Sequence, residues 1–154
     1  MNIAIGGDHR AFKHKEAINK FLVKAGHQVV DYGCYSEESA DYPDFALSVA
    51  QAVAEGMSEK GILICATGIG MSIAANKIPK IRAAVCWDKQ TIVASREHNN
   101  ANVLCLGTNY LKIPDMEEHI LVWLSTTFSG DRHTKRLDKI VQIEYKYMKE
   151  EFMG

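Results

Sequence analysis

The sequence predicts an α/β protein, a three-layer αβα sandwich of Rossmann-like type built on a five-stranded parallel sheet. Short apolar segments typical of buried strands alternate five times with segments typical of amphipathic helices. Because crossover helices join parallel strands and cover both faces of their sheet, this alternation favours a parallel arrangement. The connections are short, and no linker, repeat or low-complexity run interrupts the chain. Residues 1–154 are therefore predicted to form a single domain.

Each strand is indicated by a short apolar run, and each helix by apolar residues spaced three and four positions apart. The helical spacing is clear at Ile18, Phe21 and Leu22, which precede a natural helix stop at Gly26. The expected strands are residues 2–5, 27–32, 62–65, 81–87 and 102–106. The expected helices are residues 11–25, 44–56, 71–78, 88–97, 114–130 and 131–148.

The last of these helices carries apolar residues around much of its circumference. A single domain surface would cover only part of them, so we expect this helix to pack on a second subunit. The apolar residues in question are Leu137, Ile140, Val141, Ile143, Tyr145 and Met148.

Composition and charge exclude several classes of function. The formal net charge is −1, which gives no general attraction to nucleic acid or to an acidic membrane, so any phosphate site needs a local cluster. The chain begins with an apolar strand rather than a signal peptide, and its apolar runs are too short to span a membrane. Four cysteines lie far apart without metal-binding spacing, which is typical of buried thiols in a reducing cytoplasm.

The segment from Gly61 to Lys77, GILICATGIGMSIAANK, is the expected chemical centre. It reads as a buried strand, a glycine turn and the start of a helix, an arrangement that gathers backbone N–H groups around an anion. Cys65 is the last strand residue before the turn, where the positive end of the helix would stabilise a thiolate. We therefore expect a small enzyme whose reaction is centred on this turn.

Other glycine motifs and metal sites do not fit. Gly68 and Gly70 form G-x-G, but the third dinucleotide position is Ile73, and the turn follows the third strand rather than the first. The sequence has no P-loop, no H-E-x-x-H motif and no dense ligand set, so we expect neither a nucleotide cofactor nor a metal.

A set of polar residues remains after these exclusions. Taken singly, Asp8 would cap a helix, and His9 or His98 would be solvated surface residues. Arg132 and Arg136 lie one helical turn apart with His133 between them, and two guanidinium groups suit a phosphate dianion. We expect the set to gather along one rim of the sheet, at the carboxyl ends of the strands. Its members are Asp8, His9, Cys65, Thr67, His98, Asn99, Arg132, His133 and Arg136.

Six blocks in order resemble the ribose-5-phosphate isomerase B family, to which galactose-6-phosphate isomerase subunits also belong. They are GGDHRAFKHKE, DYPDFA, ILICATGIGMSIAANK, IRAAVC, SREHNNANVL and GDRHTKR, and together they cover essentially the whole chain. The resemblance implies interconversion of ribose 5-phosphate and ribulose 5-phosphate through a cis-enediolate, in the non-oxidative pentose phosphate pathway, without metal or organic cofactor. It also implies a homodimer whose sites are shared between subunits, and leaves open whether dimers pair into tetramers.

The resemblance implies a role for each matching residue. Cys65 would move a proton between C1 and C2, and Thr67 would shuttle the hydroxyl proton. His98 would open the furanose ring with help from Asp8. The backbone N–H groups of the turn would hold the enediolate oxygen, at Ala66, Thr67, Gly68, Ile69 and Gly70. The phosphate and sugar would be bound by His9, Tyr42, Asn99, Arg132, His133 and Arg136.

This sequence departs from the family pattern at a few positions. Ala66 replaces a glycine, which requires a negative φ there. Asn109 stands where many relatives have a phosphate-binding arginine, so either Lys112 compensates or phosphate is held more weakly. Met71 stands where one branch uses a glutamate as base, which leaves Cys65 for that role. The pair His98-Asn99 favours the ribose enzyme over the galactose type.

Three alternatives are weighed against this reading. The same chemistry on a hexose phosphate such as allose 6-phosphate would depend on pocket depth near Arg10 and Tyr42. A non-catalytic module that binds sugar phosphates or nucleotides fits the same fold, although a binder has no need of Cys65 at the turn. A cysteine hydrolase using Cys65 and His98 lacks an orienting partner for the histidine.

Overall fold

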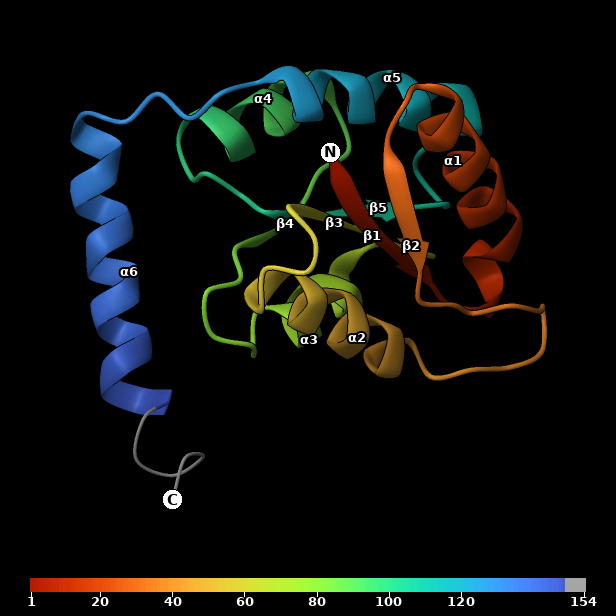
Figure 1. Cartoon of the computed structure of the whole chain (residues 1–154), viewed down its shortest axis with the longest axis horizontal. Helices are drawn as coiled ribbons and strands as arrows, with labels where there is room; N and C mark the ends of the chain where they lie inside the picture. The colour runs from red at the N-terminus through yellow and green to blue at the C-terminus, as the bar shows by residue number, and fades with distance from the viewer. Residues whose placement is uncertain (149–154) are drawn as a thin grey trace.

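The structure, a computed structural model, describes residues 1–148 and confirms the α/β sandwich (Figure 1). Its five strands are all parallel, in the order β2-β1-β3-β5-β4. The last six residues of the predicted domain lie outside the described residues. The strands are β1 (Asn2–Gly7), β2 (Gln28–Asp31), β3 (Lys60–Cys65), β4 (Ala83–Val85) and β5 (Val103–Gly107). The helices are α1 (Phe12–Lys24), preceded by the 3-10 turn η1 (His9–Ala11), α2 (Tyr42–Ala54), α3 (Ile69–Ala75), α4 (Lys89–Glu97), α5 (Ile113–Ser125) and α6 (Arg132–Met148).

Two apolar cores lie on the two faces of the sheet, with α1, α4 and α5 on one side and α2 and α3 on the other (Figure 1). Successive side chains of a strand point to opposite faces. In β3, Ile62 and Ile64 therefore join the α1/α4/α5 core, whereas Leu63 and Cys65 join the α2/α3 core. This register directs the sulfur of Cys65 to the side of the sheet where α3 begins.

The order of the strands places a switch point between β1 and β3, because the chain leaves β1 toward one edge and later returns on its other side. Ligands of open parallel sheets bind at such points, outside the carboxyl ends of the strands. Asp8 follows β1 and Cys65 ends β3, so both residues lie at this point.

Two elements, β4 and α5, fall furthest short of the length that the sequence predicts. β4 covers residues 83–85 rather than 81–87, because side chains take the flanking backbone groups: Arg82 N–H donates to Asn102 Oδ1 at 2.8 Å, and Trp87 N–H to Thr91 Oγ1 at 3.2 Å. α5 ends at Ser125 rather than near residue 130, because Thr126 is extended at ψ 124°. The chain then runs outside regular structure until α6.

α6 stands away from the sandwich in Figure 1, beside the β4 edge of the sheet. None of its side chains is buried, and Ile140, Ile143 and Tyr147 are exposed by 43%, 59% and 67%. A hydrogen bond of 3.2 Å from Lys80 N–H to Glu144 Oε2 connects it to the rest of the chain. The expectation that this helix packs on a second subunit stays a prediction. No helix within residues 1–148 is both long enough and apolar enough to cross a membrane.

Lys15 is a buried cation that fixes the loop after β2. Its ammonium group pairs with Asp31 and with Glu16, the latter at 2.9 Å, while its own side chain is fully buried. Asp31 accepts a hydrogen bond from Gly33 N–H at 2.8 Å, and Gly33 O accepts one from Gly7 N–H at 2.7 Å. Lys15 thereby connects α1 to the segment that lies beside the end of β1.

The first prediction is that Lys15→Met lowers the free energy of unfolding by about 3 kcal/mol at neutral pH, because it leaves Asp31 without its partner. Burial alone would lower the pKa of Lys15, but the hydrogen bonds and charges of Asp31 and Glu16 outweigh it and raise the pKa. The stabilisation is therefore present below the ordinary lysine pKa of about 10.4 and is lost as pH rises through the higher folded value. Urea unfolding between neutral pH and pH 11 measures both effects.

Lys13→Met is the matched control, because Lys13 pairs with Glu37 at 3.6 Å while its side chain is 78% exposed. An exposed pair of this kind contributes less than about 1 kcal/mol. Equal unfolding free energies for the two variants would contradict the role given to Lys15.

Candidate active site

The turn after β3 holds the sulfur of Cys65 against the backbone N–H of Gly68. Gly68 N–H donates to Cys65 Sγ at 3.0 Å, and Ile69 N–H donates to Thr67 Oγ1 at 3.2 Å. Gly68 adopts the left-handed conformation, with φ +79°, which is what turns its N–H back toward the strand. Cys65 is 5% exposed. The arrangement stabilises negative charge on a sulfur that is nearly enclosed but lies at the end of its strand.

The turn rests directly on the end of β5. Thr108 N–H donates to Cys65 O and Asn109 N–H to Ala66 O, both at 2.9 Å. A Cβ on Gly107 would lie 2.7 Å from the carbonyl carbon and oxygen of Thr67, so only glycine permits this approach. Ala66 is not among the residues with positive φ, which meets the requirement for alanine at that position.

Tyr42, at the start of α2, packs against the other side of the turn. A Cβ on Gly70 would come within 2.5 Å of the Tyr42 ring and 2.8 Å of its hydroxyl oxygen. The absence of a side chain at Gly70 therefore lets the phenol lie beside the first turn of α3. This contact brings the predicted sugar-lining residue next to the predicted oxyanion turn.

The end of β1 supplies two further predicted residues. Asp8 N–H donates to Ile64 O at 3.3 Å, so Asp8 lies beside the end of β3. Its Oδ1 accepts from Arg10 N–H and Ala11 N–H at 3.1 and 3.2 Å, which confirms the helix-capping role considered for it. The His9 ring is held at Nδ1 by the backbone of Ala40, whose nitrogen lies at 3.1 Å and whose carbonyl oxygen lies at 3.2 Å.

These residues form the carboxyl-edge group, defined as Asp8, His9, Tyr42 and residues 65–70. Beside it lies a hollow of about 600 Å³, lined by Thr67, Ile69, Val85, Trp87, Asn109 and Tyr110. Trp87 and Tyr110 are 55% and 59% exposed, and the sequence analysis did not select them. The signal that would have found them is their place near the ends of predicted strands: Trp87 is the last residue of the fourth predicted strand, and Tyr110 follows the fifth.

The remaining predicted residues lie elsewhere. α4 starts near the carboxyl end of β4 and runs back along the sheet, so His98 and Asn99 come at the opposite edge, where Asn102 N–H donates to Arg82 O at 3.0 Å just before β5. α6 brings its first turn to the same place, and the His98 and His133 rings stack with centroids 4.5 Å apart. The amino-edge group, defined by these contacts and positions, is His98, Asn99, Arg132, His133 and Arg136.

The expectation that all the polar residues share one rim of a single chain is therefore wrong. The strand-end rule holds for residues that directly follow a strand, such as Asp8 and Cys65, and not for residues that follow an antiparallel-running helix, such as His98. Within one chain, the two groups lie at opposite ends of the strands, so the length of the strands separates them.

The amino-edge group is strongly cationic. Partial burial and the neighbouring charges of His98, Arg132 and Arg136 lower the pKa of His133, against the opposing effect of Asp131. The permanent positive charge of the group comes from its two guanidinium groups. Paired guanidinium groups have the geometry that suits a dianion such as phosphate. Among residues 1–148, no three His, Cys, Asp or Glu side chains are grouped to hold a metal ion.

Comparison with known proteins identifies the family of the chain. A sequence profile described as Ribose/Galactose Isomerase matches residues 3–140. The chain belongs to this family. It is 43% identical over 144 residues to ribose-5-phosphate isomerase B of Escherichia coli, which covers 94% of this chain and 97% of the relative.

Solved structures of the family share the whole fold. Ribose-5-phosphate isomerase B of Clostridium thermocellum superimposes with a TM-score of 0.94 at 48% identity, covering 96% of this chain and 99% of the other. The Mycoplasma genitalium enzyme with bound ribulose-5-phosphate gives a TM-score of 0.90 at 38% identity, covering 94% and 97%. These matches confirm the resemblance and the fold class.

The second prediction concerns the approach of the turn to β5. Gly107→Ala puts a methyl group against the Thr67 backbone, which has no flexible side chain to move aside, so the turn must shift. We expect a loss of about 1–3 kcal/mol in unfolding free energy and a fall of about 100-fold in turnover. Thermal unfolding and steady-state kinetics on ribose 5-phosphate measure the two effects.

Gly61→Ala is the control, because its Cβ would meet side chains of Val49, Val53 and Val103 at the other end of β3. It is expected to lower stability while leaving turnover within a few-fold. Full turnover in Gly107→Ala would show that the position of the turn does not matter.

Proposed function

We propose that the chain is an aldose–ketose isomerase that interconverts ribose 5-phosphate and ribulose 5-phosphate, a cytoplasmic enzyme of the non-oxidative pentose phosphate pathway. The observation that carries the proposal is the hydrogen bond from Gly68 N–H to Cys65 Sγ, inside a turn of backbone donors at the carboxyl edge. The relatives named for ribose-5-phosphate isomerase, and the one with bound ribulose-5-phosphate, support the choice of substrate.

The chemistry requires a base and a stabilised oxyanion. Cys65, as thiolate, removes the proton from C2 of the open-chain aldose, and the electrons form a C1–C2 double bond while the carbonyl oxygen gains negative charge. Thr67 moves the hydroxyl proton between O2 and O1. The thiol then returns its proton to C1, which gives the ketose. Backbone donors aimed at the developing oxyanion contribute about 3–4 kcal/mol each to lowering such barriers.

Before that step the furanose ring must open. His98 fits the role of acid and base, because its exposed ring can take the proton from O1 and give one to the ring oxygen. The stack on His133 fixes the plane of the ring, with an interplanar angle of 17°. Asp8 would assist from the carboxyl-edge group.

Binding of the phosphate falls to residues of both groups. Arg132, His133 and Arg136 begin α6 and present two permanent positive charges, while His9 would contribute its ring from the other group. Tyr42 and Asn99 would line the sugar. Asn109 reaches the hollow beside the turn but carries no charge, so phosphate is held with one guanidinium fewer than in relatives that have arginine there.

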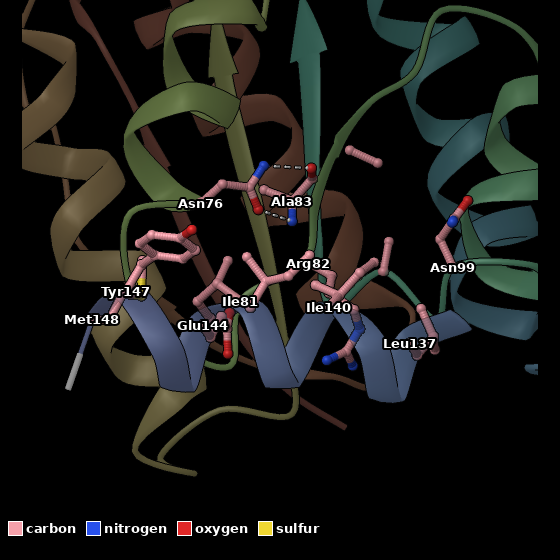
Figure 2. A pocket seen from close by; sticks show the side chains of 13 residues that line it. Asn76, Ile81, Arg82, Ala83, Asn99, Leu137, Ile140, Glu144, Tyr147 and Met148 are labelled. Atoms are coloured by element: carbon pink, nitrogen blue, oxygen red, sulfur yellow. Dashed lines mark hydrogen bonds between the residues drawn. The ribbon is translucent and has the colours of Figure 1, made fainter. Parts of the chain in front are cut away.

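The separation of the two groups leads to the proposal of a homodimer in which each site takes the carboxyl-edge group from one chain and the amino-edge group from its partner. α6 supports this, because a helix with no buried residue and several exposed apolar ones needs a second surface. Figure 2 shows Leu137, Ile140 and Tyr147 of α6 facing a groove of about 550 Å³ that Asn99 also lines. A second copy entering this groove would bring its own turn toward His98.

The comparisons do not favour the alternatives. The family profile names galactose beside ribose, but the individual relatives described above are all named for ribose 5-phosphate. A non-catalytic module would leave the hydrogen-bonded sulfur of Cys65 without a purpose. Trials of ribose 5-phosphate and allose 6-phosphate in one coupled assay, with a chelator present, separate these substrates. A chelator-sensitive rate would contradict the metal-free mechanism.

The third prediction is that Cys65→Ala lowers turnover of ribose 5-phosphate by about 10²–10⁴-fold while binding is retained, because only the base is removed. Turnover is measured by the coupled assay and binding by calorimetry. Cys86→Ala serves as control, since this thiol is buried in the core on the other face. Unchanged turnover in Cys65→Ala would exclude a cysteine base.

The fourth prediction tests the shared site. Cys65→Ala and Arg136→Ala chains, each nearly inactive alone, are unfolded, mixed and refolded together. Half of the dimers then contain one chain of each kind, and each of these has one intact site, so about a quarter of wild-type activity returns. A site built within one chain would give no recovery, because no chain in the mixture is intact.

A further inference from the structure

Arg96 connects the two segments that carry the amino-edge group, and no role has been given to it so far. It lies in the last turn of α4, and only 7% of it is exposed. Its Nη1 donates to Asn100 Oδ1 at 2.8 Å and to Ala101 O at 2.7 Å. Its Nε donates to Thr126 O at 3.2 Å. The guanidinium group is thus bonded at once to the loop after α4 and to the end of α5.

Both of these segments lead to residues of the proposed site. The loop of residues 98–101 carries His98 and Asn99, and it closes through Asn100, which adopts a left-handed φ of +47°. The segment after Thr126 leads to Arg132 and His133, and Ser129 N–H donates to Glu97 O at 3.0 Å on the way. The stack of His98 on His133 is therefore formed by two segments that Arg96 holds together.

The charge of Arg96 has no ion-pair partner among residues 1–148, where no carboxylate lies within 4 Å of its guanidinium group. A buried cation without a counter-ion costs desolvation free energy unless its donors are satisfied. Here the acceptors are an amide oxygen and two backbone carbonyls, and the Trp123 ring lies 5.8 Å from the guanidinium carbon. The planar fork of arginine meets these acceptors in different directions, which a lysine ammonium cannot do.

We propose that Arg96 is a positioning residue that sets His98 and the α6 cations in register for ring opening and phosphate binding. The inference rests on the proposed isomerase activity and adds to it a residue that touches no substrate. The role of Arg96 concerns ring opening and phosphate binding and leaves proton transfer by Cys65 unaffected. The reason is that Cys65 and its turn lie at the other edge of the same chain and make no contact with Arg96.

The test compares two readouts in wild type, Arg96→Lys and Asn100→Gly. The first is steady-state conversion of ribose 5-phosphate, which is cyclic and needs ring opening. The second is uptake of deuterium from D₂O at C1 of saturating ribulose 5-phosphate, followed by NMR. Ribulose 5-phosphate is open-chain, because its O5 is esterified, so this exchange needs Cys65 and the turn but no ring opening.

In Arg96→Lys, we expect conversion of ribose 5-phosphate to fall about 10–100-fold with a raised KM, since small misplacements of catalytic groups have effects of this size. Deuterium exchange should stay within about threefold of wild type. Asn100→Gly keeps the left-handed φ and removes one acceptor of Arg96. Its conversion of ribose 5-phosphate should therefore fall by a smaller factor than in Arg96→Lys, and its deuterium exchange should again stay close to wild type. It also provides the test if Arg96→Lys does not fold.

Ser95→Ala is the control for loss of stability alone, because it removes the bond from Trp123 Nε1 to Ser95 Oγ at 3.2 Å and leaves the hydrogen bonds of Arg96 and the Trp123 ring beside it in place. It should lower the melting temperature and leave the ratio of the two rates unchanged. Equal loss of both rates in the Arg96 and Asn100 variants, or no loss in either, would overturn the positioning role. A wild-type protein without conversion or exchange would instead overturn the proposed function itself.

Discussion

The site depends on one hydrogen bond, from Gly68 N–H to the sulfur of Cys65. That bond exists because Gly68 is left-handed, and the turn keeps its shape because it is fixed to β5 through Thr108 and Asn109. β5 stands beside β3 although β4 precedes it in the chain. The strand order therefore determines which backbone groups hold the turn, since a sheet in which β4 neighboured β3 would present different ones.

The direction of α4 determines where His98 lies relative to Cys65. A helix that links parallel strands must run back across the sheet, so its last residues come at the amino edge, and His98 lies far from Cys65 in the same chain. The expected common cleft for the sulfur and the two α6 guanidinium groups is thus absent from a single subunit. A second copy that presents its amino-edge group to this turn would supply the cleft, and the exposed apolar side chains of α6 would be covered by the same contact.

Local patterns in the sequence predicted what local interactions decide. The strand–turn–helix around Cys65 and the cap by Asp8 follow from a few adjacent residues, and both are present. The structural features that the sequence did not predict depend on contacts between distant segments. The start of β4 depends on the bond from Arg82 N–H to Asn102, twenty positions away, and the stack of His98 on His133 joins two segments far apart in the chain. The same holds for Arg96, whose bond to Thr126 O at the end of α5 spans thirty positions.

The proposed use of a thiol as base fits the enclosure of the turn. Met71, the position at which one branch of the family has a glutamate, is fully buried in the α2/α3 core and cannot take a proton. A neutral thiol is buried at little cost, whereas an ionised carboxylate at the same depth would need compensating charge throughout the catalytic cycle. The N–H of Gly68 donates to the sulfur of Cys65, so the enclosed turn already holds a hydrogen-bond donor at the atom on which the proposed reaction depends.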